Sequence, residues 1–100
     1  MPRSNLAAAL IKQGSPAEAL VLAQEAWALN PRTKSAALQA GYALALLERY
    51  ADAIPWFRRE LELEPDSVQA WTNLGAALVA VGQAQEAVVP LETALRLDPT

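Results

Sequence analysis

The chain contains no cysteine and no histidine. The absence of cysteine excludes disulfides and thiolate metal sites. Both cytosolic and periplasmic proteins can lack cysteine, and we favour a cytosolic location. The absence of histidine removes the usual general base near neutral pH and the commonest metal ligand. The serines (Ser4, Ser15, Ser35 and Ser67) therefore have no evident base partner. We expect no catalytic residue, no metal and no cofactor, and we predict that the chain is not an enzyme.

Long apolar runs and basic stripes are also missing. No stretch approaches the roughly 18 apolar residues of a membrane helix, and the apolar run at residues 6–11 is too short for a signal-peptide core. The formal net charge is −3, and Arg58-Arg59 is the only adjacent pair of basic residues. The sequence therefore predicts a soluble chain that neither inserts into a membrane nor binds nucleic acid.

Apolar residues make up 53% of the 100 residues, and alanine supplies much of that share. A chain of this length forms one domain or a piece of a larger one. Small side chains suit helices that approach each other closely. Richness in alanine, leucine and arginine is also typical of a bacterial source with a GC-rich genome.

The chain repeats itself. Prolines at positions 31, 65 and 99 follow one another at an interval of 34 residues, each with a leucine two residues before it. The same shift aligns Leu10 with Leu44 and Leu78, and Ala19 with Ala53 and Ala87. Repetition at a fixed interval of this size indicates stacked helical units.

Within each unit, apolar residues recur every three or four positions, which is the spacing of one helix face. We predict six helices, at about residues 3–13, 16–29, 34–47, 50–63, 67–81 and 84–97, with short connections that make neighbours antiparallel. Ser15 as N-cap, Pro16 in the first helical position and Glu18 three residues after the cap mark one helix start. The repeated prolines end each pair because the residue before a proline disfavours helical geometry.

Two prolines, Pro55 and Pro90, lie inside predicted helices. Pro90 cannot donate a hydrogen bond to the carbonyl of Glu86, so we expect it to kink or loosen the last helix. Trp27 and Trp56 are predicted to be packing residues.

Glu60 takes the place that alanine occupies in the other units, Ala26 and Ala94. It also begins an acidic run, completed by Glu62, Glu64 and Asp66. We interpret this run as a solvated helix end rather than a metal site, because oxygen ligands for a cation have to converge from a loop.

The landmarks of the third unit resemble a tetratricopeptide repeat (TPR). They are Trp71-Thr72-Asn73-Leu74-Gly75, Leu78, Gly82, Glu86-Ala87, Ala94 and Leu97-Asp98-Pro99. The resemblance covers the chain as a single TPR domain of three units, at about 1–33, 34–67 and 68–100. It implies an all-α solenoid of helix-turn-helix units forming a right-handed superhelix of six helices. Such arrays commonly end with a further polar helix, so we expect this chain to be a fragment of a longer array.

In this family the first helix of each pair lines a concave groove that holds peptide segments of partner proteins. The resemblance therefore implies a peptide-binding groove from three units. Its residues would be Asn5, Ala8, Ile11 and Lys12; then Ser35, Leu38, Gln39, Tyr42, Ala45 and Leu46; and then Gln69, Thr72, Asn73, Ala76, Val79 and Ala80. Lys12 is the only ionic group among them.

Asn5, Gln39 and Asn73 are each 34 residues apart. A primary amide offers both a donor and an acceptor, so it can pair with one peptide unit of an extended chain. The three resemble the asparagine ladder of some TPR proteins, although three solvated polar residues would give the same pattern. The cations of the family's carboxylate clamp are replaced by Ser4, Gln69 and Asn73, which disfavours acidic chaperone tails.

The leading hypothesis is an interaction scaffold that holds an extended or helical segment of a partner protein in this groove. One alternative is a self-assembly module that forms homo-oligomers through its stack ends or groove. Another is the substrate-recruiting arm of a larger enzyme.

Overall fold

The computed structural model of the chain describes residues 15–99. Five α-helices make up this part: α2 (Pro16–Leu29), α3 (Ala36–Leu46), α4 (Tyr50–Leu63), α5 (Val68–Ala80) and α6 (Ala84–Leu97), with no strand among the described residues. The all-helical fold class is confirmed. The predicted bounds of α2, α4 and α6 are matched, whereas α3 and α5 are shorter than predicted at both ends. The helix expected at residues 3–13 lies outside the described residues.

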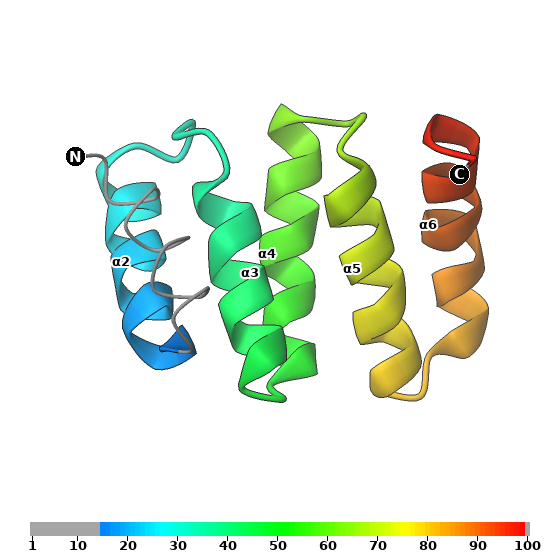
Figure 1. The fold of residues 1–100 in the computed structure, drawn as a ribbon, viewed down its shortest axis with the longest axis horizontal. Coiled ribbons are helices and arrows are strands. Elements are labelled where there is room, and N and C mark those ends of the chain that lie inside the picture. Colours follow the sequence, from blue (N-terminus) through cyan, green and yellow to red (C-terminus); the bar gives the residue numbers. More distant parts are fainter. Residues whose placement is uncertain (1–14, 100) are drawn as a thin grey trace.

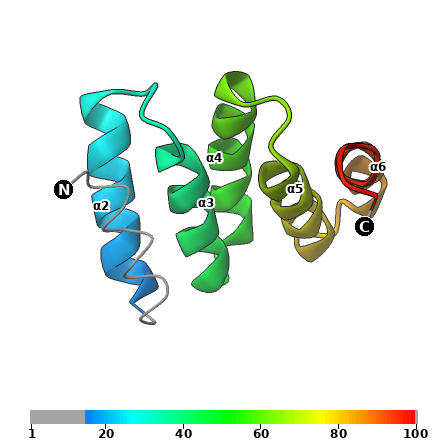
Figure 2. The same ribbon diagram turned by 45° about the horizontal axis from the view of Figure 1, so that its top comes forward.

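The helices stand side by side in chain order, with neighbours antiparallel (Figure 1). In the turned view, α3 lies between α2 and α4, and α5 lies between α4 and α6 (Figure 2). Cα atoms of α3 come within 8 Å of α5, but among the described helices neither α2 and α4 nor α4 and α6 approach that closely. We call α3 and α5 the inner row and α2, α4 and α6 the outer row. Because α3 and α5 lie closer to each other than the helices of the outer row do, the stack curves toward the inner row.

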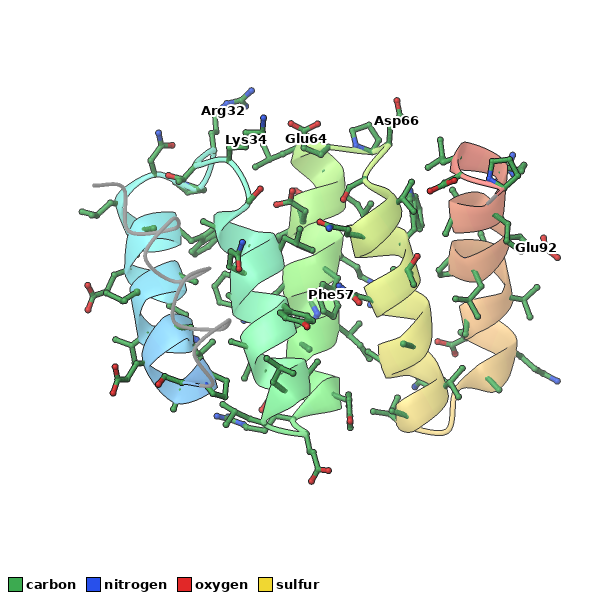
Figure 3. The ribbon with its side chains drawn as sticks, in the orientation of Figure 1. Arg32, Lys34, Phe57, Glu64, Asp66 and Glu92 are labelled. Atoms are coloured by element: carbon green, nitrogen blue, oxygen red, sulfur yellow. The ribbon has the colours of Figure 1, made fainter. Side chains whose placement is uncertain are left out.

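Small residues let these helices pack closely. Alanines that are fully or nearly fully buried (Ala19, Ala23, Ala40, Ala43, Ala53, Ala70, Ala77 and Ala87) make up much of the core. Phe57, near the middle of the stack in Figure 3, is the largest fully buried side chain among the described residues. A Cβ added at Gly41 would lie 2.7 Å from its ring. Glycine at this position therefore allows α3 and α4 to approach around a large aromatic side chain.

The repeated prolines end the outer-row helices as predicted. α2, α4 and α6 stop at Leu29, Leu63 and Leu97, two residues before each proline. The serines at the N-cap positions of α2 and α5 differ in whether they form a capping hydrogen bond. Ser67 caps α5, because its Oγ accepts a hydrogen bond of 3.1 Å from the N–H of Ala70. Ser15 occupies the N-cap position of α2 and Pro16 its first turn, but the Ser15 side chain makes no capping hydrogen bond.

The turns inside the second and third units have the same geometry despite different residues. Gly82 has φ of +84° and Glu48, at the corresponding position, has φ of +61°. In each turn the next backbone N–H, of Arg49 or Gln83, donates a 2.8 Å hydrogen bond to a leucine carbonyl near the end of the preceding helix. Glu48 thus adopts a left-handed conformation that glycine adopts without strain.

Pro90 does not interrupt the last helix. α6 runs through it from Ala84 to Leu97, so the helix continues past the position where we expect it to kink or loosen. Pro90 is buried, together with Ala87 and Ala94, on one face of α6. Its ring is therefore part of the packed face of α6.

Candidate functional site

The predicted groove residues that the structure describes lie on the inner row. Tyr42 and Leu46 on α3 and Val79 on α5 are exposed apolar side chains. Gln69, Thr72 and Ala76 are exposed as well, and Gln39 and Asn73 are half-buried. Asn5, Ala8 and Lys12 lie outside the described residues. The inner row therefore presents an apolar surface with amide side chains beside it.

Leu38 differs from the other predicted groove residues. Its side chain is only 9% exposed, and it belongs to the hydrophobic core. In this structure Leu38 therefore offers little surface to a ligand. The sequence could not separate it from Tyr42, because both lie on the same short apolar helix.

Charge is divided sharply between the two rows. The helices α3 and α5 contain no Asp, Glu, Lys or Arg, whereas α2, α4 and α6 all carry such residues. Arg32, Lys34, Glu64 and Asp66 lie at the edge formed by the loops between units (Figure 3). A ligand on the described part of the inner row would thus meet apolar and amide groups rather than ions.

Glu60 is not part of a solvated helix end. Glu62, Glu64 and Asp66 are exposed, as predicted, but the Glu60 side chain is only 2% exposed, and that part of the interpretation is wrong. At this point α4 packs against the start of α3. The other units have alanine at the same position. The signal available in the sequence was this alignment with Ala26 and Ala94.

The Glu60 carboxyl accepts a hydrogen bond from the backbone N–H of Leu38, in the first turn of α3. Its Oε1 atom has no hydrogen-bond partner. Burial raises the pKa of Glu60, the Leu38 hydrogen bond opposes this rise, and the charge of Glu64 adds to it. Because Ser35 does not cap α3 with its side chain, Glu60 supplies an acceptor to the helix start that carries Gln39 and Tyr42.

Two absences hold for residues 15–99. No three or more acidic side chains lie together as a metal site would require. No helix there is both long and apolar enough to cross a membrane.

Antiparallel helix pairs that repeat every 34 residues and stack in chain order define a helical repeat protein. The family model described as "Tetratricopeptide repeat" matches residues 5–67, and a second model of the same description matches residues 56–89. The chain belongs to the tetratricopeptide repeat family.

Related proteins match parts of this chain in sequence. It is 40% identical over 58 residues to the Hsp70-Hsp90 organizing protein of Triticum aestivum, covering 58% of the chain and 10% of that protein. It is 34% identical over 68 residues to the tetratricopeptide repeat-containing protein trd-1 of Caenorhabditis elegans, covering 68% of the chain and 9% of that protein. The chain thus spans about a tenth of the length of these relatives.

Solved structures share the fold. The first TPR domain of Spaghetti (RPAP3), bound to the HSP90 peptide SRMEEVD, matches with a TM-score of 0.93 at 22% identity, over 98% of this chain and 78% of that one. YrrB, described as a TPR protein with an unusual peptide-binding site, matches with a TM-score of 0.87 at 27% identity, over 97% of this chain and 50% of that one. Similar architectures therefore occur in proteins that bind peptides.

Proposed function

We propose that this protein is an interaction scaffold whose inner row holds a segment of a partner protein. The observation that carries the proposal is that α3 and α5 combine exposed apolar side chains with half-buried amides and lack charged residues. The peptide bound by the Spaghetti domain supports a role in peptide binding, since that protein has the same fold. The surface residues of the inner row then decide which peptides fit.

The chemistry of the inner row favours an uncharged, extended segment. Tyr42, Leu46 and Val79 would contact apolar side chains of the ligand. Gln39 and Asn73 would pair with its backbone, because each amide can donate and accept. The peptide SRMEEVD ends in several carboxylates, and the described inner row has no cation to receive them. With few contacting units, we expect a Kd of about 1 μM, roughly 8 kcal/mol of binding free energy.

Peptides selected from a random display library against the wild-type protein would test this proposal by isothermal titration calorimetry. We expect the selected peptides to be poor in charge, and SRMEEVD to bind at least tenfold more weakly than they do. Asn73→Ala and Tyr42→Ala should each weaken binding without unfolding the protein. Val21→Ala is the matched control, since Val21 is an exposed apolar residue of the outer row. Unchanged binding in both inner-row variants would refute the proposed groove.

The open face of α6 favours a second candidate function, self-assembly. Leu20 on α2 and Ile54 on α4 are each 8% exposed, whereas Val88, at the corresponding position of α6, is 48% exposed. In the stack α3 packs against α2, and α5 packs against α4. The apolar face around Val88 is the kind of surface that associates in solution, and a second copy of the chain supplies helices of the same repeat type.

Sedimentation velocity over a range of protein concentrations would test self-assembly. Val88→Glu should shift the population toward monomer, because it places a charge on the face that we expect to be covered. Val89→Glu is the control, since Val89 and its equivalents, Val21 and Pro55, are exposed in every unit. A monomeric wild type at high concentration would exclude this candidate.

A further inference from the structure

Three side chains bridge α2 and α4 on the outer row. The rings of Trp27 on α2 and Trp56 on α4 meet edge to face, with centroids 5.1 Å apart and an interplanar angle of 83°. The Cζ atom of Arg59, on α4, lies 5.0 Å from the centroid of Trp27 and 4.6 Å from that of Trp56. All three residues are half-buried. We call them the Trp–Arg cluster.

The repeat architecture does not require this cluster. The same three positions in the other units hold aliphatic, proline, threonine and glutamate side chains, so helix stacking is compatible with quite different residues there. The equivalents are Leu61 and Leu95 for Trp27, Leu22 and Pro90 for Trp56, and Glu25 and Thr93 for Arg59.

The Arg59 guanidinium has no ionic partner among the described residues. No carboxylate approaches it within ion-pair distance, and Glu62, three residues further along α4, does not reach it. The only buried side-chain polar atom without a hydrogen-bond partner in residues 15–99 belongs to Glu60, so no Arg59 nitrogen is both fully buried and unpaired. The rings hold the guanidinium in place while its N–H donors stay available.

We propose that the Trp–Arg cluster is a second docking site, which binds a carboxylate side chain in an acidic segment of a partner protein. A guanidinium presents its donors in a fork that matches a carboxylate, and one held by aromatic rings has already lost much of its side-chain freedom. Tryptophan and arginine are also the residue types that most often dominate binding at protein interfaces. Arg58, exposed beside Arg59, adds positive charge to an otherwise acidic protein.

This site is distinct from the inner row. Its three residues lie on α2 and α4, whereas the proposed groove residues described by the structure lie on α3 and α5. The two surfaces also differ in chemistry, because the inner row has no charged side chain. The docking site can therefore be tested while the groove is disabled.

The experiment titrates the protein with a capped hexaglutamate peptide and follows the indole N–H signals by ¹H–¹⁵N correlation NMR. The three tryptophans give separate reporters, and Trp71 serves as an internal reference because its indole N–H donates a 2.7 Å hydrogen bond to the Pro65 carbonyl instead. We expect the Trp27 and Trp56 signals to shift saturably, the Trp71 signal to stay in place, and capped hexaglutamine to have no effect. Added salt should weaken binding, since it screens exposed charges.

Two variants with the same charge change separate a specific site from general attraction. Arg59→Thr introduces the residue that the third unit has at this position, and it should raise the Kd at least tenfold. Arg58→Thr removes the neighbouring charge and should raise it less than threefold. Arg59→Lys, which keeps the charge but not the fork, should also weaken binding, and it decides the question if circular dichroism shows that Arg59→Thr is unfolded.

Several results would overturn the docking site. They are the absence of a saturable shift in the wild type, equal binding of hexaglutamine, and equal losses in the Arg58 and Arg59 variants. Asn73→Ala should leave hexaglutamate binding unchanged. If the groove proposal is wrong, only the binding of the library peptides will contradict it. If the docking site is wrong, only the hexaglutamate titration will contradict it.

Discussion

Replacing Glu60 by alanine tests whether a buried carboxyl makes the protein sensitive to pH. At acid pH, where the raised pKa favours the protonated carboxyl, the change removes one methylene group, worth about 0.8 kcal/mol. It also removes the acceptor for the Leu38 N–H, worth about 1 kcal/mol. Glu60→Ala should therefore lower the free energy of unfolding by about 2 kcal/mol at pH 4.5. The alanines at the equivalent positions of the other units indicate that the variant will fold.

This cost should shrink as the pH rises. The pKa of Glu60 is raised above its usual value of 4.5, so between the two values the folded state holds a proton that the unfolded state has released. The free energy of unfolding of the wild type then falls with increasing pH, by at most about 1.4 kcal/mol per pH unit for one proton. Glu60→Ala lacks this proton, so its stability should change less over the same range.

Urea denaturation followed by circular dichroism, at pH values from 4.5 to 8.5, measures the difference between the two proteins. Glu60→Gln should resemble Glu60→Ala in its weaker pH dependence, while Glu62→Ala, at an exposed position of the same helix, should follow the wild type. A stability difference between wild type and Glu60→Ala that is constant across this range would refute the reasoning. So would a difference that grows with pH.

Four further substitutions test packing, backbone conformation and helix capping. Gly41→Ala should lower the free energy of unfolding by about 1–3 kcal/mol, because its Cβ would lie 2.7 Å from the Phe57 ring; an unchanged thermal midpoint would contradict this. Glu48→Gly should stabilise the protein by about 1 kcal/mol, since it relieves a left-handed conformation, and chemical denaturation showing a loss would argue against that strain. Ser67→Ala should cost about 1 kcal/mol and Ser15→Ala only a few tenths, because only Ser67 forms a capping hydrogen bond; equal losses would disprove the distinction.

The helical framework was predictable from the sequence because it depends on local signals. The bounds of α2, α4 and α6 follow from repeated prolines and from apolar spacing. The turn at Glu48 follows from the predicted end of one helix at residue 47 and start of the next at residue 50, although only the structure shows that Glu48 and Gly82 share a left-handed φ. Such features depend on residues close to one another in the chain, or on residues that the repeat superposes.

Features that depend on contacts between helices were not predictable in the same way. Glu60 was read with the acidic residues that follow it, yet helix packing removes its side chain from water. Trp27 and Trp56 were predicted to pack, but their joint contact with Arg59 was missed. The three residues do not follow the 34-residue interval, so only the spacing of α2 and α4 brings them together.

That spacing has a mechanical consequence. A stack whose outer helices stand apart can change its curvature by opening or closing those gaps. Between α2 and α4 such bending has to disturb the contact between Trp27 and Trp56, whereas no aromatic or cation–π contact among the described residues bridges α4 and α6. The two gaps therefore differ in stiffness, and the solenoid should flex more readily on the α6 side of α4 than on the α2 side.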